Sequence, residues 1–324
     1  MKTQFVGLVG DIGGTNARLA LVDTEGHIRH PKTYAAADYA SLSEVIATYL
    51  EDLTKGRRLA RAALAVAGPV VDGEIAFTNI DWRISEGELV GTFEFETARL
   101  LNDFAAQAMA APLLSPDNLR QIGPDLKGAE GAPVVVLGAG TGFGVAGLAR
   151  SDRGDLAISA EGGHASFAPG DDVEIEVLKI LRRKYERVSI ERVLSGQGLF
   201  DLYQALGEIN GSPAPLKDQK AVTTEGLKGD VLASQTLDRF LEIYGSAAGD
   251  IALTYGARGG VYISGGIAPR LIERMLSGGF RRRFEAKGRL TDYMVDIPTA
   301  LIVHPYAALV GAARVLSHLE ANPL

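Results

Sequence analysis

Residues 8–22, with the sequence LVGDIGGTNARLALV, constrain the fold of this chain more than any other segment. The apolar runs over residues 4–10 and 19–22 lack helical periodicity, so each predicts a strand. Between them lie a carboxylate, two glycines and two small polar residues: Asp11, Gly13, Gly14, Thr15 and Asn16. The segment therefore predicts a hairpin with a polar, glycine-rich turn.

This turn suits a phosphate group. Gly13 and Gly14 can take positive φ and carry no Cβ, so backbone N–H groups can close on an anion. Thr15 and Asn16 add side-chain donors, and Asp11 is a hard oxygen ligand suited to Mg2+, directly or through water. A nucleotide polyphosphate with its metal would fit here, and an ordinary two-glycine hairpin is the alternative.

Two better-known glycine motifs do not match. A P-loop needs Gly-Lys-Ser/Thr at the start of a helix, and no lysine lies between Lys2 and Lys32. A dinucleotide-binding motif needs a helix after its glycines, whereas apolar and β-branched residues here continue as a second strand.

Composition limits the class of protein. The 324 residues, 46% hydrophobic and 23% charged, predict a soluble globular protein of about two domains. Cysteine is absent, which excludes disulfides and thiolate metal sites and favours a reducing compartment. The net charge of -7 offers no general attraction to nucleic acid or anionic lipid. The basic triplet Arg281, Arg282 and Arg283 is expected to be a solvated face.

Targeting signals are not expected. A strand begins by about Gln4, which leaves no room for a signal peptide, and no apolar run approaches the ~20 residues of a membrane span. The sequence therefore predicts a cytoplasmic protein that does not enter the membrane.

The first half of the chain predicts the order β-β-β-α-β-α, followed by one more strand and helix. Capping boxes at Ser41 with Glu44 and at Ser85 with Glu88 begin the first two helices. The other predicted elements are a third strand ending near Tyr34, a buried strand over residues 62–67, a strand over 99–101 that ends in Asn102 and Asp103, and a helix over 104–111.

The second half begins after the loop-rich residues 112–133 and repeats this plan. A buried strand over 134–137, the glycine turn GAGTGFG over 138–144 and a return strand over 145–149 make a second hairpin. The elements predicted after it are a strand near Ile158, a helix capped by Asp171 or Asp172 and running to Tyr185, a helix opened by Ser189, a long helix over 231–255, strands over 259–264 and 299–303, and a closing helix over 306–319. Two related domains would hold a nucleotide in the cleft between them.

Five blocks together resemble the bacterial ATP-dependent glucokinases. They are GDIGGTNARL at 10–19, LLNDF at 100–104, LGAGTGFG at 137–144, EGGH at 161–164 and ISGGI at 263–267. The resemblance implies an α/β fold of two domains, the actin-like ATPase (ribonuclease H-like) fold of the hexokinase, actin and heat-shock ATPase superfamily. It also implies that the C-terminal helix packs on the first domain, which gives a small domain of residues 1–111 plus 304–324 and a large domain of residues 112–303. A homodimer is implied as well.

The resemblance assigns roles residue by residue. Residues 11–16 resemble the first phosphate motif, and a second phosphate motif and an adenosine motif are carried over to Gly138, Gly140, Thr141 and Gly142 and to Ser264, Gly265 and Gly266. Asp103 resembles the catalytic base that accepts the proton of a sugar hydroxyl. The sugar-binding set is Asn102, Asp103, Glu161, His164 and Glu191, whose carboxylates suit vicinal hydroxyls. ATP and Mg2+ are the implied co-substrate and metal, and glucose is the implied substrate.

Several of these residues also have structural interpretations. Asp103 precedes a helix and could be its N-cap, His164 could be a loop or core histidine, and Glu191 could belong to a capped helix start. Related sugar kinases hold zinc with a similar histidine and a cysteine cluster, and this chain has no cysteine, so zinc is not expected. Asn79 and Trp82 either line the cleft or close a loop.

Three functions compete. The first is a glucokinase that makes glucose 6-phosphate and ADP, with another hexose such as fructose, mannose or N-acetylglucosamine as the alternative substrate. The second is a sugar-sensing regulator, which would carry a helix-turn-helix before the first phosphate motif. Here that motif starts within about ten residues of Met1, which is too few for such a domain. The third is a chaperone-type ATPase, which would have no use for the sugar set.

Overall fold

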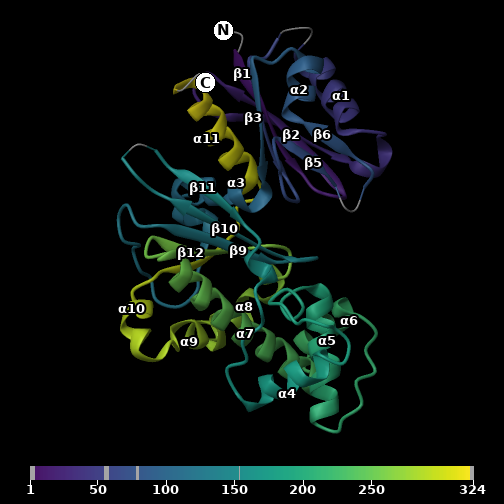
Figure 1. Ribbon diagram of the computed structural model, residues 1–324, viewed down its shortest axis with the longest axis vertical. Coiled ribbons are helices and arrows are strands. Elements are labelled where there is room, and N and C mark those ends of the chain that lie inside the picture. The colour runs from purple at the N-terminus through teal and green to yellow at the C-terminus, as the bar shows by residue number, and fades with distance from the viewer. Residues whose placement is uncertain (1–3, 55–57, 78–79, 153, 322–324) are drawn as a thin grey trace. The chain divides into compact units, whose positions relative to one another are not determined.

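The computed structural model describes residues 4–54, 58–77, 80–152 and 154–321 (Figure 1). The chain divides into two compact units, Met1–Leu114 with His304–Leu324, and Ser115–Val303. We call them the N-terminal unit and the central unit and describe each by itself.

The N-terminal unit is built on a five-stranded sheet in the order β3-β2-β1-β4-β7. The strands β1, β2 and β3 form an antiparallel meander, and β4 and β7 continue the sheet in parallel with β1. Their bounds are β1 (Phe5–Ile12), β2 (Asn16–Asp23), β3 (Ile28–Ala35), β4 (Arg61–Val66) and β7 (Thr97–Asn102). The predicted hairpin is thus confirmed, and its first strand, β1, is the central strand of the sheet, with β4 on its other side.

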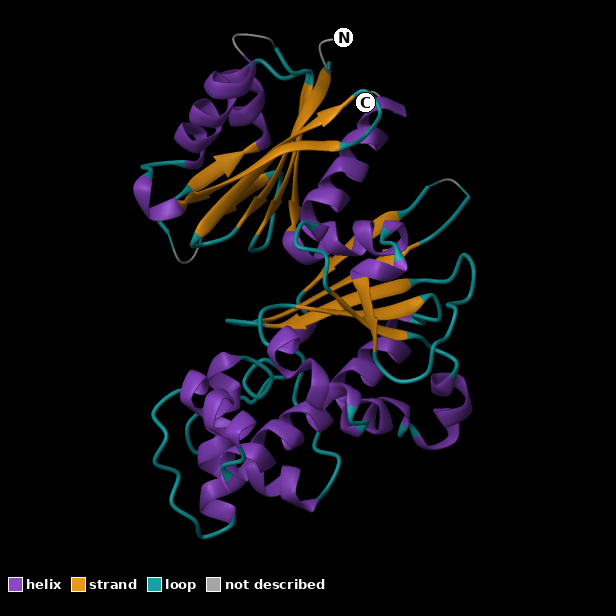
Figure 2. Ribbon diagram, turned by 180° about the vertical axis from the view of Figure 1, so that it is seen from behind, coloured by secondary structure: helices purple, strands orange, loops and turns teal. Residues whose placement is uncertain are grey.

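Helices cover both faces of this sheet (Figures 1 and 2): α1 (Leu42–Thr54), α2 (Glu86–Phe93), α3 (Asp103–Ala110) and α11 (Ala307–Ala321). Alternate residues of β1 face opposite ways, because strand side chains have a period of two. Leu8 and Ile12 pack in the core that contains the α1 residues, and Val9 packs with Leu309 and Leu316 of α11. The C-terminal helix therefore completes the N-terminal unit.

Residues between β4 and α2 form a small two-stranded sheet, β5 (Glu74–Ala76) and β6 (Arg83–Ser85). Trp82 is buried in the core of this unit and meets the Phe77 ring edge-on, with the ring centroids 6.3 Å apart. Trp82 therefore packs its own loop. Asn79 lies outside the described residues.

The helices α3 and α11 cross at a glycine. A Cβ built on Gly311 would lie 1.7 Å from the carbonyl oxygen of Ala106, so only glycine fits at this position. Ala308 and Ala312, on the same helix, are buried, and small side chains on both helices permit this close approach.

We expect Gly311→Ala to destabilise the N-terminal unit by about 1–3 kcal/mol, because the added methyl group forces the two helices apart. Urea unfolding followed by the fluorescence of Trp82, the single tryptophan, measures this effect. Gly91→Ala in α2 is the matched control: its Cβ would meet nothing within 4 Å, so helix propensity should leave stability unchanged or raise it by up to ~1 kcal/mol. Equal unfolding midpoints for the two variants would contradict the expectation.

The central unit contains a six-stranded sheet in the order β11-β10-β9-β12-β13-β8. Again an antiparallel meander is followed by two parallel strands, and β8 adds an antiparallel edge. The bounds are β8 (Leu119–Gln121), β9 (Val134–Ala139), β10 (Phe143–Ala149), β11 (Leu156–Ala160), β12 (Gly260–Ser264) and β13 (Thr299–Ile302). The strand β8 was not predicted, because its three residues lie in a segment rich in glycine and proline.

The helices of the central unit gather on one side of its sheet (Figure 2). They are α4 (Asp172–Leu181), α5 (Gly196–Ile209), α6 (Gln219–Lys228), α7 (Val231–Tyr255), α8 (Ile272–Leu276), α9 (Gly279–Glu285) and α10 (Thr291–Val295). Asp230 caps α7 by accepting from the Ala233 N–H at 2.8 Å, and Gly256 ends it with φ 59°. The predicted bounds of this long helix are confirmed.

Two helix predictions need correction. Asp171 is indeed the N-cap of α4, but the helix ends at Leu181, and tighter turns carry the chain on to Tyr185. Ser189 does not open a helix: it forms an isolated antiparallel bridge with Ser166, and bends and a turn follow over residues 190–195. The next helix, α5, begins at Gly196 with Ser195 as its N-cap.

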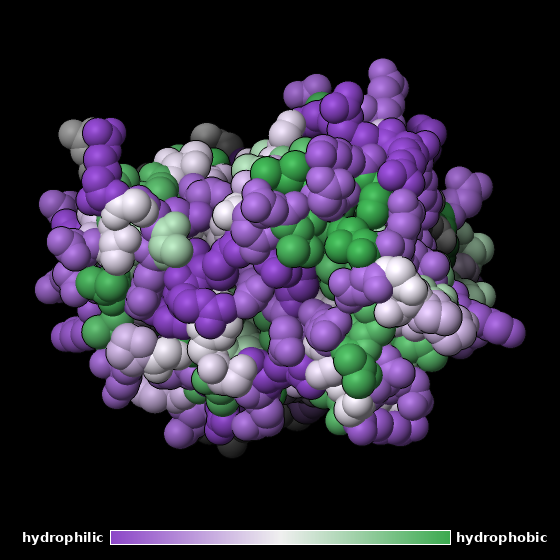
Figure 3. All heavy atoms as spheres, turned by 90° about the horizontal axis from the view of Figure 1, so that it is seen from below, coloured by the Kyte–Doolittle hydropathy of each residue, from purple (hydrophilic) through white to green (hydrophobic). Residues whose placement is uncertain are grey.

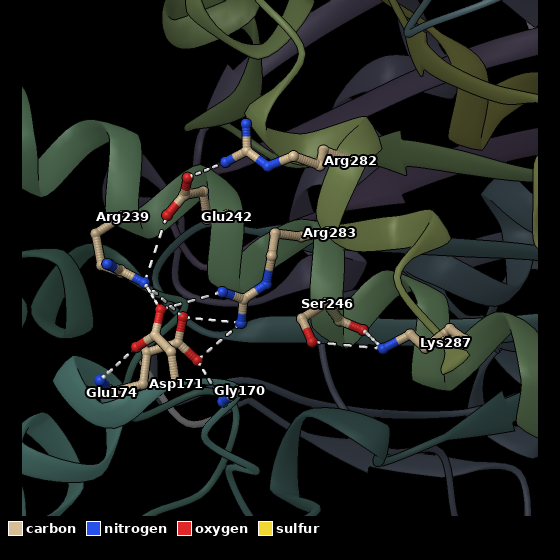
Figure 4. Close-up of polar contacts among 9 residues, drawn as sticks. All are labelled: Gly170, Asp171, Glu174, Arg239, Glu242, Ser246, Arg282, Arg283 and Lys287. Atoms are coloured by element: carbon tan, nitrogen blue, oxygen red, sulfur yellow. Dashed lines mark hydrogen bonds and ion pairs between the residues drawn. The ribbon is translucent and has the colours of Figure 1, made fainter. Parts of the chain in front are cut away.

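The basic triplet is not a solvated face. Arg281 is buried and donates through Nη1 to the Ile297 carbonyl at 2.7 Å, and Arg283 pairs with the buried Glu174 (Figure 4). Only Arg282 has a mostly exposed side chain, at 66%. The prediction was wrong because the carbonyl groups of residues 295 and 297 accept from Arg281, and the carboxylates at the start of α4 accept from Arg283.

Within the described part of the chain, no helix is both long and apolar enough to cross a bilayer. On the face shown in Figure 3, hydrophilic residues predominate and hydrophobic residues form separate patches between them.

Candidate active site

The predicted site residues of the N-terminal unit lie at one edge of its sheet. Ile12 pairs with Val66, and Val66 pairs with Asn102, so the carboxyl ends of β1, β4 and β7 are in register. The Ala67 N–H also donates to the Ile12 carbonyl at 2.9 Å. The glycine turn after β1 and the residues that follow β7 are therefore neighbours in space, about two strand spacings apart.

The first glycine turn is closed by its own backbone. The Gly13 N–H donates to the Asn16 carbonyl at 2.9 Å, and the Ala36 N–H donates to the Thr15 carbonyl at 2.9 Å. Gly13 and Gly14 can take positive φ, but neither does so in this turn. A Cβ on Gly13 would meet only the Asn16 oxygen at 3.7 Å, an ordinary contact, so folding alone does not require glycine at position 13.

Asp11 lies on β1 and forms an ion pair. Its Oδ2 accepts from Nη1 of Arg18 at 2.9 Å. Burial raises the pKa of Asp11 above its usual value, and the Arg18 charge partly offsets that rise. The Arg18 guanidinium also lies 5.5 Å from the ring centroid of Tyr306.

Arg18 is a site residue that the sequence analysis missed. A hairpin symmetric about residues 14 and 15 pairs position 11 with position 18, and the structure has this register. The register of the hairpin could therefore have identified the partner of Asp11.

The turn after β7 contains Asn102 and Asp103. Asn102, not Asp103, is the N-cap of α3: its Oδ1 accepts from the N–H groups of Phe104 and Ala105 at 2.9 and 3.2 Å. The Asn102 amide donates to the Gly68 carbonyl at 3.2 Å. Asp103 is the first residue of α3, half-buried, and its Oδ1 accepts from its neighbour's N–H at 3.0 Å. The N-cap interpretation of Asp103 is thus wrong.

The second glycine turn lies in the central unit, between β9 and β10. Backbone contacts hold it: a Cβ on Gly138 would lie 2.5 Å from the Ser264 carbonyl oxygen, and one on Gly265 would lie 2.4 Å from the Ala139 oxygen. Gly265 also has φ 85°, which favours glycine. The predicted phosphate and adenosine motifs are therefore packed directly against each other.

A cavity of about 420 Å³ opens beside these two motifs. The predicted residues Gly140, Thr141 and Gly266 line it. So do residues that sequence reasoning missed: Gly196, Gln197, Leu199, Gln219, Lys220, Thr223, Ile267 and Arg270. Gly196 and Gln197 begin α5, and the N-terminus of a helix favours an anion. Leu199 also lies on α5, Gln219, Lys220 and Thr223 lie on α6, and Ile267 and Arg270 follow β12.

The remaining sugar-binding candidates also lie in the central unit. Glu161 and His164 flank a single 3-10 turn, with exposed side chains and 3.9 Å between Oε2 and Nε2. The carboxylate of Glu191 turns to the second glycine turn, where its Oε2 accepts from the Phe143 N–H at 2.9 Å. The Glu191 N–H donates to the Gly163 carbonyl at 2.9 Å. Hydrogen bonds therefore connect Glu191 to both the sugar-binding candidates and the second glycine turn.

A cluster of possible metal ligands lies elsewhere in the described residues. Asp23, Glu25 and His27 bring their ligand atoms within 4.8 Å of one another. Asp23 Oδ1 accepts from the backbone N–H groups of the other two at 3.0 and 2.9 Å, and its Oδ2 pairs with Arg29. These bonds form the turn between β2 and β3, so the cluster has a structural role.

Comparison with known proteins identifies the family. The family model described as Glucokinase matches residues 8–319. The chain belongs to the glucokinase family. It is 50% identical to the glucokinase of Caulobacter sp. (strain K31) over 311 residues, which are 95% of this chain and 94% of that one. A glucokinase structure from an Antarctic psychrotroph is 38% identical, with a TM-score of 0.90, and covers 97% of this chain and 100% of that chain.

Membership of this family makes the chain an ATP-dependent hexose kinase and decides against the regulator and the chaperone-type ATPase. The fold is the expected actin-like ATPase fold. A ROK family glucokinase from Streptomyces griseus, solved in complex with glucose and AMPPNP, shares this fold at 18% identity, with a TM-score of 0.62 and coverage of 96% and 99%.

Proposed function

We propose that this glucokinase transfers the γ-phosphoryl group of ATP to the 6-hydroxyl of glucose, with Asp103 as the general base. The observation that carries the proposal is the shared sheet edge: the first glycine turn and Asp103 follow strands that are in register. A carboxylate positioned within ~3 Å of a hydroxyl orients it and accepts its proton as the phosphoryl group transfers. Another hexose, such as fructose, mannose or N-acetylglucosamine, is the alternative substrate.

The nucleotide is proposed to bind in the cavity beside the second glycine turn. Its volume of about 420 Å³ is within the range of small-molecule sites. Gly140 and Thr141 would contact the phosphates, Gly266 and Ile267 would lie against the adenosine, and Lys220 or Arg270 would supply positive charge. The first glycine turn would bind the transferred phosphate, since folding leaves room at Gly13.

Asp11 fits a magnesium ion that accompanies the nucleotide. Mg2+ is commonly held by one or two carboxylates together with substrate phosphates, and Asp11 is a half-buried carboxylate at the first glycine turn. Bound Mg2+ would neutralise charge on the phosphates. Arg18 holds the Asp11 carboxylate in place through its hydrogen bond to Oδ2.

The sugar is proposed to bind to Glu161, His164 and Glu191, whose polar atoms suit hydroxyl groups. The role of Asn102 is narrower than the resemblance implied. Its oxygen caps α3 and its amide already donates to the Gly68 carbonyl, so it chiefly positions Asp103.

A coupled assay that detects ADP tests the proposal, with ATP and Mg2+ and with glucose, fructose, mannose or N-acetylglucosamine as acceptor. The highest kcat/KM is expected with glucose. A higher kcat/KM with another hexose would make that hexose the preferred substrate in place of glucose. No turnover with any of the four sugars would overturn the proposal.

Two further properties are proposed from the family resemblance: a cytoplasmic location, where ATP is available, and a homodimer. Sedimentation of the purified protein measures the second.

A further inference from the structure

Two hydrogen bonds, one buried and one partly buried, hold the second glycine turn at its two ends. Ala139 and Phe143 pair across the antiparallel strands β9 and β10. The Ala139 N–H donates to Oη of Tyr244 at 3.2 Å, and the Phe143 N–H donates to Oε2 of Glu191 at 2.9 Å. Tyr244 is fully buried and its ring meets the Phe143 ring edge-on at 5.5 Å. Side chains from α7 and from the turn before α5 therefore clamp the turn that lines the nucleotide cavity.

The glycine at position 142 makes room for this clamp. A Cβ on Gly142 would lie 2.5 Å from Oε2 of Glu191, closer than real Cβ contacts allow. Gly142 has no positive φ, so a side chain here would not strain the backbone; it would displace the Glu191 carboxylate from its present position. The small residue at position 142 of the GAGTGFG sequence therefore leaves space for the Glu191 carboxylate as well as for a phosphate.

Glu191 is also tied to the turn that contains Glu161 and His164. Its N–H donates to the Gly163 carbonyl, and a Cβ on Gly163 would lie 2.1 Å from the Phe143 oxygen. The residues proposed to bind sugar and the turn proposed to bind phosphate therefore share direct contacts inside one unit. A shift of the Glu191 carboxylate must move the Phe143 N–H or break their hydrogen bond.

We propose that Glu191 is a positioning residue for the nucleotide-binding turn in addition to being a sugar ligand. One carboxylate oxygen holds the Phe143 N–H, and the carboxylate also faces the sugar, so one side chain couples the two substrates. The coupling is reciprocal by linkage: a sugar that orders this carboxylate favours the nucleotide-bound turn, and a nucleotide favours the sugar-bound carboxylate. This inference rests on the proposed function for the identity of the two ligands.

The test separates the positioning role from sugar contact. Binding of the magnesium complex of AMPPNP is measured by calorimetry without any sugar. Glu191→Ala is expected to weaken it about tenfold, the order expected when a hydrogen bond to a charged group is lost. Glu191→Gln is expected to keep most of the nucleotide affinity, because an amide oxygen also accepts from the Phe143 N–H. Its KM for glucose should still rise, since the amide changes the group offered to the sugar.

Three further variants test the positioning role of Glu191 independently. Gly142→Ala should weaken nucleotide binding as Glu191→Ala does, because the methyl group displaces the carboxylate. Tyr244→Phe removes the other acceptor and should weaken nucleotide binding while leaving the KM for glucose unchanged. Glu186→Gln removes the same charge from an exposed side chain five residues earlier and should change neither ligand's affinity.

Hydrogen exchange provides a readout that does not depend on the activity. The Phe143 amide, followed by NMR, should exchange at least tenfold faster in Glu191→Ala than in the wild type or in Glu191→Gln. Unchanged AMPPNP affinity and unchanged Phe143 exchange in Glu191→Ala would overturn the positioning role. The amide exchange result is the same whichever sugar is the substrate, so failure of this inference and failure of the proposed function are distinguishable.

Discussion

Asp103→Asn is expected to lower kcat about a thousandfold while leaving glucose binding nearly unchanged. An asparagine amide has the shape of the carboxylate but does not accept a proton, and general base catalysis contributes about 10²–10⁴-fold. The local fold should survive, because the asparagine oxygen can still accept from the Phe104 N–H, as Asp103 Oδ1 does at 3.0 Å. Steady-state kinetics give kcat, and calorimetry gives the dissociation constant of glucose.

Asp11→Asn is the contrasting variant. It keeps Asp103, the proposed proton acceptor, and replaces the carboxylate proposed to face the metal by a neutral amide, so its main effect should be a raised KM for MgATP. A kcat for Asp103→Asn within threefold of the wild type would refute the base assignment. Weaker glucose binding in that variant, with normal kcat, would make Asp103 a sugar ligand only.

The second large effect is expected at the buried ion network of the central unit (Figure 4). Glu174 on α4 is fully buried and pairs with Arg239 of α7 at 3.0 Å and Arg283 of α9 at 2.9 Å. Its Oε2 also accepts from the Gly170 N–H at 2.7 Å. Asp171 forms ion pairs with the same two arginines. Three helices therefore meet at one buried carboxylate.

We expect Glu174→Gln to destabilise the central unit by about 3–5 kcal/mol, because removing one partner leaves buried charge uncompensated. In urea unfolding followed by far-UV circular dichroism, the midpoint should fall by about 1 M or more. Glu176→Gln is the matched control on the same helix: its side chain is 51% exposed and pairs with Lys179 on the surface. A surface pair contributes about 0–1 kcal/mol, so equal midpoints for the two variants would contradict a stabilising network.

Acid should weaken the same network. Although burial tends to raise it, the hydrogen bond from the Glu174 N–H and the ion pair with Arg239 hold the pKa of Asp171 below its usual value of 3.8. A group whose pKa is lower in the folded state stabilises fully above its unfolded pKa and loses that contribution as pH falls through the folded value. The contribution of Asp171 should therefore be complete at neutral pH and be lost only in acid, as pH falls through its lowered folded pKa.

Local sequence patterns predicted most of the fold because the forces involved are local. Strand and helix periodicity located the hairpin at Asp11 and the long helix α7, and Ser85 and Asp171 are N-caps as expected. Predictions failed where packing between distant segments decides. Arg281 and Arg283 were predicted to be surface charges, but distant carbonyl groups and carboxylates accept from them. Ser189 was predicted to open a helix, but residues 188–191 bond to the backbone of residues 163–167.

The residues of the candidate site also fall into those that local patterns predicted and those that only packing brings together. The glycine turns and Asp103 were identified from motifs, because phosphate binding and proton transfer need particular residue types at short spacing. The cavity-lining residues Gln219, Lys220 and Arg270 were missed, since they come from separate segments and have no shared pattern. The hairpin register could have identified Arg18 from the sequence. Its position over the Tyr306 ring could not have been predicted, because the two residues are far apart in the chain.

The two glycine turns and the acid–base residue types were predictable from the sequence, because each depends on residues within about ten positions of one another. The family was predictable because five such short blocks occur together in one order along the chain. What those residues contact depends on the tertiary structure. Asn102 is the helix cap in place of Asp103, and the Glu191 carboxylate accepts from the Phe143 N–H, 48 positions away. Such contacts depend on side-chain direction and on the space left by Gly142 and Gly163, which no local pattern encodes.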